Sequence, residues 1–159
     1  KFFKIFNLIL IMGNYICIDC FLKYKTNDLT LYNIKGLYRA KVVDVYDGDT
    51  ITIVIFNKGG FEKHKLRLYG IDTPEMKPSK NLPNREQHIQ KAHLAKDKLS
   101  ERILNKIIQV DIKGNEKYGR LLGTIYLKSY CGNKENINQY MLDNNYGYAY
   151  EGGTKKTQI

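Results

Sequence analysis

Residues 47–75 read DGDTITIVIFNKGGFEKHKLRLYGIDTPE, and this stretch decides the fold. Isoleucine occupies every second position from 51 to 55, which predicts a β-strand over residues 50–56 with one buried face. The pair Gly59-Gly60 supplies a turn, and Leu66 and Leu68 give a returning strand over residues 61–69 its own apolar face. Because side chains alternate along a strand, Arg67 is predicted on the face opposite the two leucines.

The rest of the chain continues the β pattern around one long helix. Residues 37–46 predict a strand before the hairpin, and residues 107–112 and 121–127 predict two strands after it. Apolar residues spaced by three and four predict a helix over residues 85–105, and residues 136–145 predict a shorter one, followed by an extended segment. We therefore expect a mainly β fold with helices. It would be a five-stranded OB-fold barrel with a helix between strands 3 and 4 and a further C-terminal helix.

Acidic residues stand near the ends of the predicted strands. If adjacent strands bring Asp49 and Asp72 together, their carboxylates could bind a hard cation such as Ca²⁺, with water and the carbonyl of Thr73 completing the shell. The planar fork of Arg67 could hold a phosphate on the same ion. Glu75 is placed to orient or deprotonate a water. The combination predicts a metal-dependent phosphodiesterase site.

Each piece also has a purely structural interpretation. Asp-Gly-Asp is a common turn between strands, and Thr-Pro-Glu often begins a helix. The motif Lys117-Tyr118-Gly119-Arg120 lies downstream of these pieces, and the combination favours the functional interpretation.

Three ordered motifs carry a resemblance to the staphylococcal nuclease, or thermonuclease-like, domain family. They are VDVYDGDT at 43–50, RLYGIDTPE at 67–75 and KYGR at 117–120, and the similarity runs from about residue 37 to 150. The resemblance implies Ca²⁺ ligands at Asp49, Asp72 and the carbonyl of Thr73, with the acid Asp47 behind them. It further implies catalytic roles for Glu75, which acts on the attacking water, and for two arginines that stabilise the transition state, Arg67 and Arg120.

The same resemblance implies the substrate. Similar proteins cut DNA and RNA on the 5′-oxygen side, so we expect a calcium-dependent endonuclease with little sequence preference. The residues expected to bind substrate are Lys117, Tyr118, and Tyr148 or Tyr150, the two candidates for a tyrosine that stacks on a base. The alternative is a non-cleaving OB-fold module that binds nucleic acid or a protein.

Charge and composition agree with a polyanionic partner. The chain has 159 residues, a formal net charge of +10 and 13 tyrosines, whose rings can stack on unpaired bases. We expect residues 1–35 to be an apolar, targeting and linker segment, 36–150 the thermonuclease-like domain and 151–159 a tail. The expected state is a monomer.

The apolar run at 2–12 is too short to span a bilayer. It predicts a signal peptide, or else sequence upstream of a true start at Met12. In the second case Gly13 would be acylated, with Cys17 and Cys20 as palmitoylation sites. A plain tail is the third alternative. The first two predict a secreted or membrane-attached protein, with a cytoplasmic one as the alternative.

Overall fold

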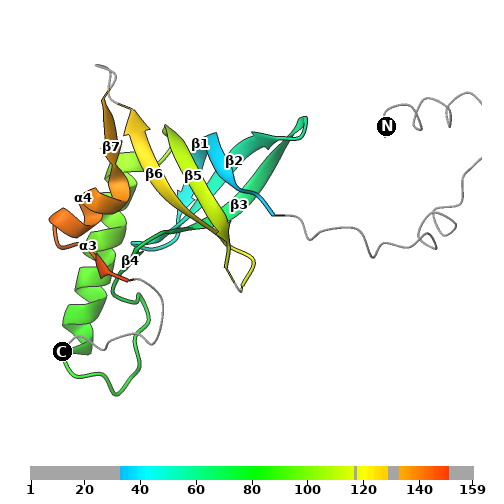
Figure 1. The fold of residues 1–159 in the computed structure, drawn as a ribbon. Helices are drawn as coiled ribbons and strands as arrows, with labels where there is room; N and C mark the ends of the chain where they lie inside the picture. The colour runs from blue at the N-terminus through cyan, green and yellow to red at the C-terminus, as the bar shows by residue number, and fades with distance from the viewer. Residues whose placement is uncertain (1–32, 117, 129–132, 151–159) are drawn as a thin grey trace, which may run out of the picture. The chain divides into compact units, whose positions relative to one another are not determined.

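A closed barrel of five strands forms the centre of the fold in a computed structural model, which describes residues 33–116, 118–128 and 133–150 (Figure 1). Antiparallel pairing joins β1 to β2 and β5, β2 to β3, and β5 to β6. A parallel pairing of Leu66 with Leu121 closes β3 on β6. This is the predicted OB-fold order. The strands are β1 (Gly36–Val45), β2 (Thr50–Asn57), β3 (Gly60–Leu68), β5 (Ile107–Asn115) and β6 (Leu121–Lys128).

The remaining elements lie around the barrel. Both predicted helices are present, and the short strands β4 and β7 were not predicted. The elements are β4 (Ile71–Asp72), α3 (Arg85–Ile103), β7 (Lys134–Asn136), α4 (Ile137–Asp143) and β8 (Tyr148–Ala149). The predictions for residues 1–32, including Cys17 and Cys20, and for 151–159 lie outside the described residues. Among the described residues no helix has the length and apolar character needed to cross a membrane.

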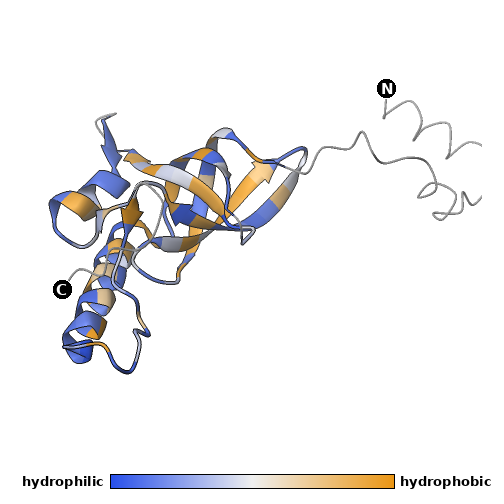
Figure 2. Cartoon of the chain, turned by 60° about the horizontal axis from the view of Figure 1, so that its bottom comes forward, coloured by the Kyte–Doolittle hydropathy of each residue, from blue (hydrophilic) through white to orange (hydrophobic). Residues whose placement is uncertain are grey.

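The core combines the inward faces of the strands with one face of α3. The isoleucines of β2 are buried, as the alternation predicted. Helix α3 is largely hydrophilic along its length (Figure 2), and its buried residues recur at helical spacing. They are Ala92, Ala95, Leu99 and Ile103. Because α3 packs by this narrow stripe, it covers the barrel and leaves its polar face to solvent.

Two long-range contacts hold the C-terminal part against the barrel. The buried side chain of Asn138, on α4, accepts a hydrogen bond from the Ile125 amide at 3.0 Å and donates one to the Tyr69 carbonyl at 2.8 Å. Beyond α4, β8 pairs antiparallel with β4, so that Tyr148 lies opposite Asp72. The C-terminal strand β8 therefore lies next to Asp72, in the middle of the motif at 67–75.

Candidate metal and phosphate site

The loop between β1 and β2 is fixed by its own first acid. The Asp47 carboxylate accepts hydrogen bonds from the amides of Asp49, at 3.1 Å, and Thr50, at 2.7 Å. Gly48 is packed so closely that a Cβ would lie 2.9 Å from the Thr73 side chain. A larger residue there would have to push Thr73 aside. The loop therefore has little freedom in where it places Asp49.

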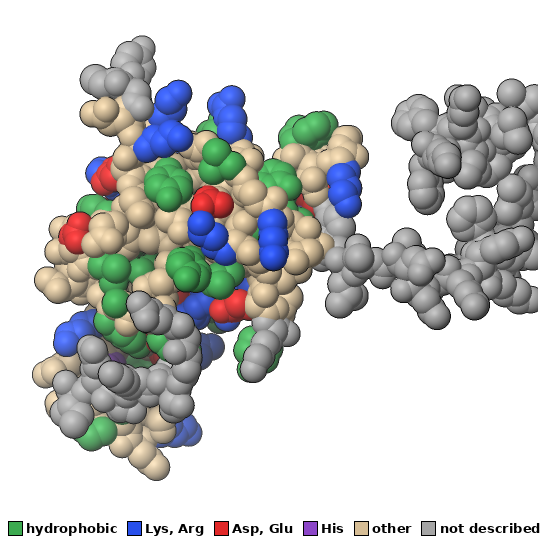
Figure 3. Space-filling model, viewed as in Figure 1, with side chains coloured by type: hydrophobic (Ala, Val, Ile, Leu, Met, Phe, Trp, Pro, Cys, Tyr) green, Lys and Arg blue, Asp and Glu red, His purple; other side chains and the backbone are tan. Residues whose placement is uncertain are grey.

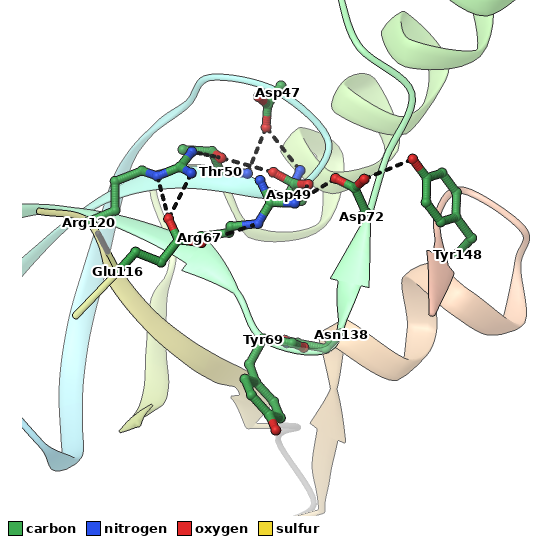
Figure 4. Close-up of polar contacts among 10 residues, drawn as sticks. All are labelled: Asp47, Asp49, Thr50, Arg67, Tyr69, Asp72, Glu116, Arg120, Asn138 and Tyr148. Atoms are coloured by element: carbon green, nitrogen blue, oxygen red, sulfur yellow. Dashed lines mark hydrogen bonds and ion pairs between the residues drawn. The ribbon is translucent and has the colours of Figure 1, made fainter. Parts of the chain in front are cut away.

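Asp49 and Asp72 point toward one another across Arg67 (Figure 4). The Nη2 atom of Arg67 lies 2.9 Å from Asp49 Oδ2 and 2.5 Å from Asp72 Oδ1. The strand register explains the meeting, since Thr50 pairs with Arg67 and β4 begins soon after β3 ends. Arg67 is on the outward face as predicted, yet its side chain is only 13% exposed because the two carboxylates lie over it. The predicted convergence of these three residues is present.

The site carries more buried negative charge than one arginine balances. Asp49 is 3% exposed and Asp72 is 1% exposed. Burial raises the pKa of Asp49 to about 7, although the positive charge of Arg67 acts in the other direction. Burial opposes the charged form of Arg67, but the neighbouring carboxylates outweigh it and raise its pKa. A further positive charge between the aspartates would relieve the cost of ionising both.

Arg120 reaches the same place from the β5–β6 connection. Its Nη2 and Nε atoms lie 2.7 Å and 2.9 Å from Glu116 Oε2, and its Nη1 donates to the Thr50 hydroxyl at 3.4 Å. The other oxygen, Glu116 Oε1, lies 3.7 Å from Arg67 Nε. A single carboxylate thus faces both arginines. The two guanidinium groups lie on one side of the barrel and share an anion.

Glu116 was not predicted from the sequence. It lies four residues before Arg120, a spacing that brings side chains together on a helix, but these residues form a turn. The turn is closed by backbone hydrogen bonds from the Glu116 amide to the Arg120 carbonyl, at 2.7 Å, and from the Gly119 amide to the Glu116 carbonyl, at 3.1 Å. Only this turn geometry could have revealed the contact.

Tyr148 contacts a predicted metal ligand directly. Its hydroxyl donates a hydrogen bond to Asp72 Oδ2 at 2.8 Å. Burial and the bonded carboxylate raise the pKa of the hydroxyl, so it stays protonated and remains a donor. Tyr150, the other candidate, is held by its backbone amide, which donates to the Gly70 carbonyl at 3.0 Å.

The other predicted site residues lie around this centre. Thr73 is buried directly after Asp72. Glu75 is exposed on the loop after β4, and its negative charge is one of the smaller causes that raise the pKa of Tyr148. Tyr118, two positions before Arg120 in the sequence, is 85% exposed, and Lys117 lies outside the described residues.

The donor set fits a weakly held hard cation. Asp49 and Asp72 offer oxygen atoms already directed at one positive group. Nowhere among the described residues do three or more His, Cys, Asp or Glu side chains come together as a metal site, and this site offers only two carboxylates. An ion bound here would depend on two carboxylates, with backbone carbonyl and water oxygens for the rest, which are the ligands that Ca²⁺ takes.

The chain belongs to the family of staphylococcal nuclease homologues, which it matches over residues 65–158. This match contains Arg67, Asp72 and Arg120, while Asp49 lies before it.

Similarity to individual proteins is modest. A micrococcal nuclease of Shigella flexneri is 30% identical over 124 residues, covering 76% of this chain and 63% of that protein. An uncharacterised endonuclease of Haemophilus influenzae is 32% identical over 111 residues, covering 70% of this chain and 52% of that protein. An uncharacterised protein of Methanocaldococcus jannaschii is 31% identical over 127 residues, covering 70% and 58%. The chain thus spans somewhat more than half the length of these relatives.

Proposed function

We propose that this domain is a calcium-dependent endonuclease that hydrolyses phosphodiester bonds of DNA and RNA. The observation that carries the proposal is the convergence of two buried aspartates and two arginines on one side of the barrel. Carboxylate oxygens suit a divalent ion, and guanidinium groups suit a phosphate. Relatives named micrococcal nuclease and endonuclease support the same activity.

Asp49 and Asp72 would hold the ion, with the carbonyl of Thr73 as a further ligand. When bound, Ca²⁺ would polarise a phosphate oxygen as a Lewis acid. Tyr148 would keep Asp72 oriented through the hydrogen bond to its second oxygen. Asp47 would act on Asp49 through the loop that it fixes by two amide contacts.

The arginines would bind and stabilise the scissile phosphate. Arg67 and Arg120 already share a carboxylate anion, Glu116, so a phosphate could take that position between them. Glu75 is exposed and would position the attacking water and accept its proton. Because all these contacts are to phosphate and water, they carry no base information, which accounts for weak sequence preference.

A plasmid assay tests the proposal. Supercoiled DNA incubated with the protein should become nicked and then degraded in Ca²⁺ and stay intact in EGTA. Asp72→Asn should abolish this, and Asp97→Asn, which changes an exposed acid on α3, should not. Intact DNA in Ca²⁺, with the protein still bound to it, would refute the nuclease and favour the non-cleaving binding module.

The arginines have a quantitative test. Loss of one preorganised donor to a developing oxyanion commonly lowers kcat by about 10²–10³. Arg67→Ala and Arg120→Ala should each show a loss of this size, while Arg85→Ala, at an exposed position on α3, should keep the wild-type rate. Unchanged turnover in the first two variants would remove them from the mechanism.

A further inference from the structure

The outward face of the β2–β3 hairpin leads away from the site. The register pairs Thr52 with Lys65, Val54 with Lys63, and Phe56 with Phe61. Alternate residues of a strand share a face, so four residues of β3 form one line. We call this line the outer row: Arg67, Lys65, Lys63 and Phe61. It runs from the candidate phosphate site to the tip of the hairpin.

The outer row ends in an aromatic pair that is open to solvent. Phe61 is 80% exposed and Phe56 is 59% exposed, and their ring centroids lie 5.3 Å apart in an edge-to-face arrangement. The two-residue turn beside them has positive φ at Lys58 and Gly59, as a tight hairpin turn requires. Two large exposed rings on a short, fixed turn do not serve the core. They form an exposed apolar platform at the tip of the hairpin.

The middle of the outer row is cationic. Lys63 and Lys65 are both exposed, and the Lys65 ammonium lies 6.0 Å from the ring centroid of Tyr46, which is itself 64% exposed. The neighbouring carboxylate on β3, Glu62, points to the other face and pairs with His64 at 2.9 Å. Glu62 therefore does not neutralise the positive charges of Lys63 and Lys65.

Acidic and basic groups on the adjacent strand do not reverse that charge. On β1, the exposed Asp44 lies opposite Thr52, and the exposed Lys41 lies opposite Val54. Their charges offset one another. More generally, Lys and Arg side chains stand among exposed hydrophobic ones on the face drawn in Figure 3.

We propose that the outer row binds the part of a single-stranded polynucleotide that flanks the bond to be cut. This inference rests on the proposed function and names its preferred substrate. Lysines would contact phosphates, and the phenylalanine pair would stack on an unpaired base, whose face a duplex hides. Phe61 and Arg67 are six positions apart on one strand, a span of ~20 Å. A strand long enough to reach the phenylalanine pair should therefore bind more tightly than a shorter one.

Binding to two labelled oligothymidylates in EGTA, one of 12 and one of 3 nucleotides, tests the lysines. Lys63→Gln with Lys65→Gln should reduce the preference for the longer strand. It should also flatten the dependence of log Kd on log salt by about 1.4, because each lost contact to a single strand contributes about 0.7. The matched control, Lys91→Gln with Lys128→Gln, removes two exposed charges away from the row and should keep the wild-type length preference and slope.

The aromatic pair has its own variant. Phe61→Leu keeps an apolar side chain but removes the ring, and should weaken binding of the 12-nucleotide strand about fivefold or more while sparing the 3-nucleotide strand. Equal losses for both strands, or no loss in either the lysine or the phenylalanine variant, would overturn the proposal. So would a loss of binding to anionic lipid vesicles in these variants with oligonucleotide binding unchanged.

Failure here is distinguishable from failure of the nuclease. If the wild type cuts plasmid in Ca²⁺ but the outer-row variants match their controls in both binding tests, the proposed nuclease activity is kept and the proposed role of the outer row is rejected. If the wild type cuts nothing, the EGTA binding measurements still decide whether the outer row holds a single strand.

Discussion

Replacing Glu116 with glutamine should tighten phosphate binding by about tenfold. In the structure the Glu116 carboxylate contacts both guanidinium groups, at 2.7 Å and 2.9 Å from Arg120 and at 3.7 Å from Arg67. A substrate phosphate must displace this carboxylate before the arginines can bind it. Glutamine keeps the shape of the side chain and removes the charge.

The magnitude follows from the ion pair with Arg120. Glutamine can still accept hydrogen bonds from the Arg120 guanidinium, so the substitution removes mainly the attraction between the two charges, which contributes about 0.2–1 kcal/mol in exposed ion pairs. Glu116 and Arg120 are only 23% and 26% exposed, and Arg67 faces the other carboxylate oxygen, so we take a value just above that range. About 1.4 kcal/mol less competition corresponds to a tenfold lower Kd.

Calorimetric titration with a nucleoside 3′-phosphate measures this Kd directly, and initial rates on an oligonucleotide supply kcat and KM. Because the weakened competition favours bound substrate and transition state equally, KM should fall while kcat stays near the wild-type value. Glu101→Gln removes an exposed acid from α3 and controls for the change in net charge. An unchanged Kd together with a reduced kcat would show that Glu116 orients Arg120 and does not compete with the phosphate.

Three further outcomes follow from the site. Tyr148→Phe removes the hydrogen bond to Asp72 and should lower calcium affinity or activity about 10–100-fold, because metal sites typically lose this much when a contact that supports a ligand is removed. A calcium titration of the cleavage rate measures the effect, and a curve unchanged from the wild type would contradict it. Gly48→Ala forces a Cβ against Thr73 and should destabilise the fold by about 1–3 kcal/mol in urea unfolding, so wild-type stability would mean that the loop yields easily. Burial raises the pKa of Asp49 to about 7, and a protonated carboxyl is a poor ligand, so calcium affinity should rise with pH up to about 7 and level off above it. Calorimetry at pH 6 and 8 checks this, and equal affinities would contradict it.

The strands of the barrel could be predicted because their signal is local. Alternating isoleucines define β2. The helix signal was equally local, but α3 ends at Ile103 and not at Asn105. The Leu104 amide still bonds to the Ser100 carbonyl, and Asn105 adopts a positive φ that ends the helical path. Strands β4 and β7, of two and three residues, are too short to show any period.

The site was predictable only where sequence motifs carried it. Asp49 and Arg67 lie together as expected because the hairpin register pairs Thr50 with Arg67, and Asp72 joins them from β4, which follows β3 closely. The contact between Tyr148 and Asp72 could not be predicted, because it depends on the β4–β8 pairing, which joins residues 76 positions apart.

The central proposal is that Asp49 and Asp72 would hold one divalent ion beside a phosphate that Arg67 and Arg120 would bind. Anomalous diffraction from crystals grown with Ca²⁺ and a nucleoside 3′-phosphate tests it directly. We predict one calcium peak within bonding distance of both aspartates and a phosphate in contact with both arginines, with Glu116 turned away. A calcium peak elsewhere, or none while Arg67 still bridges the two aspartates, would contradict the account.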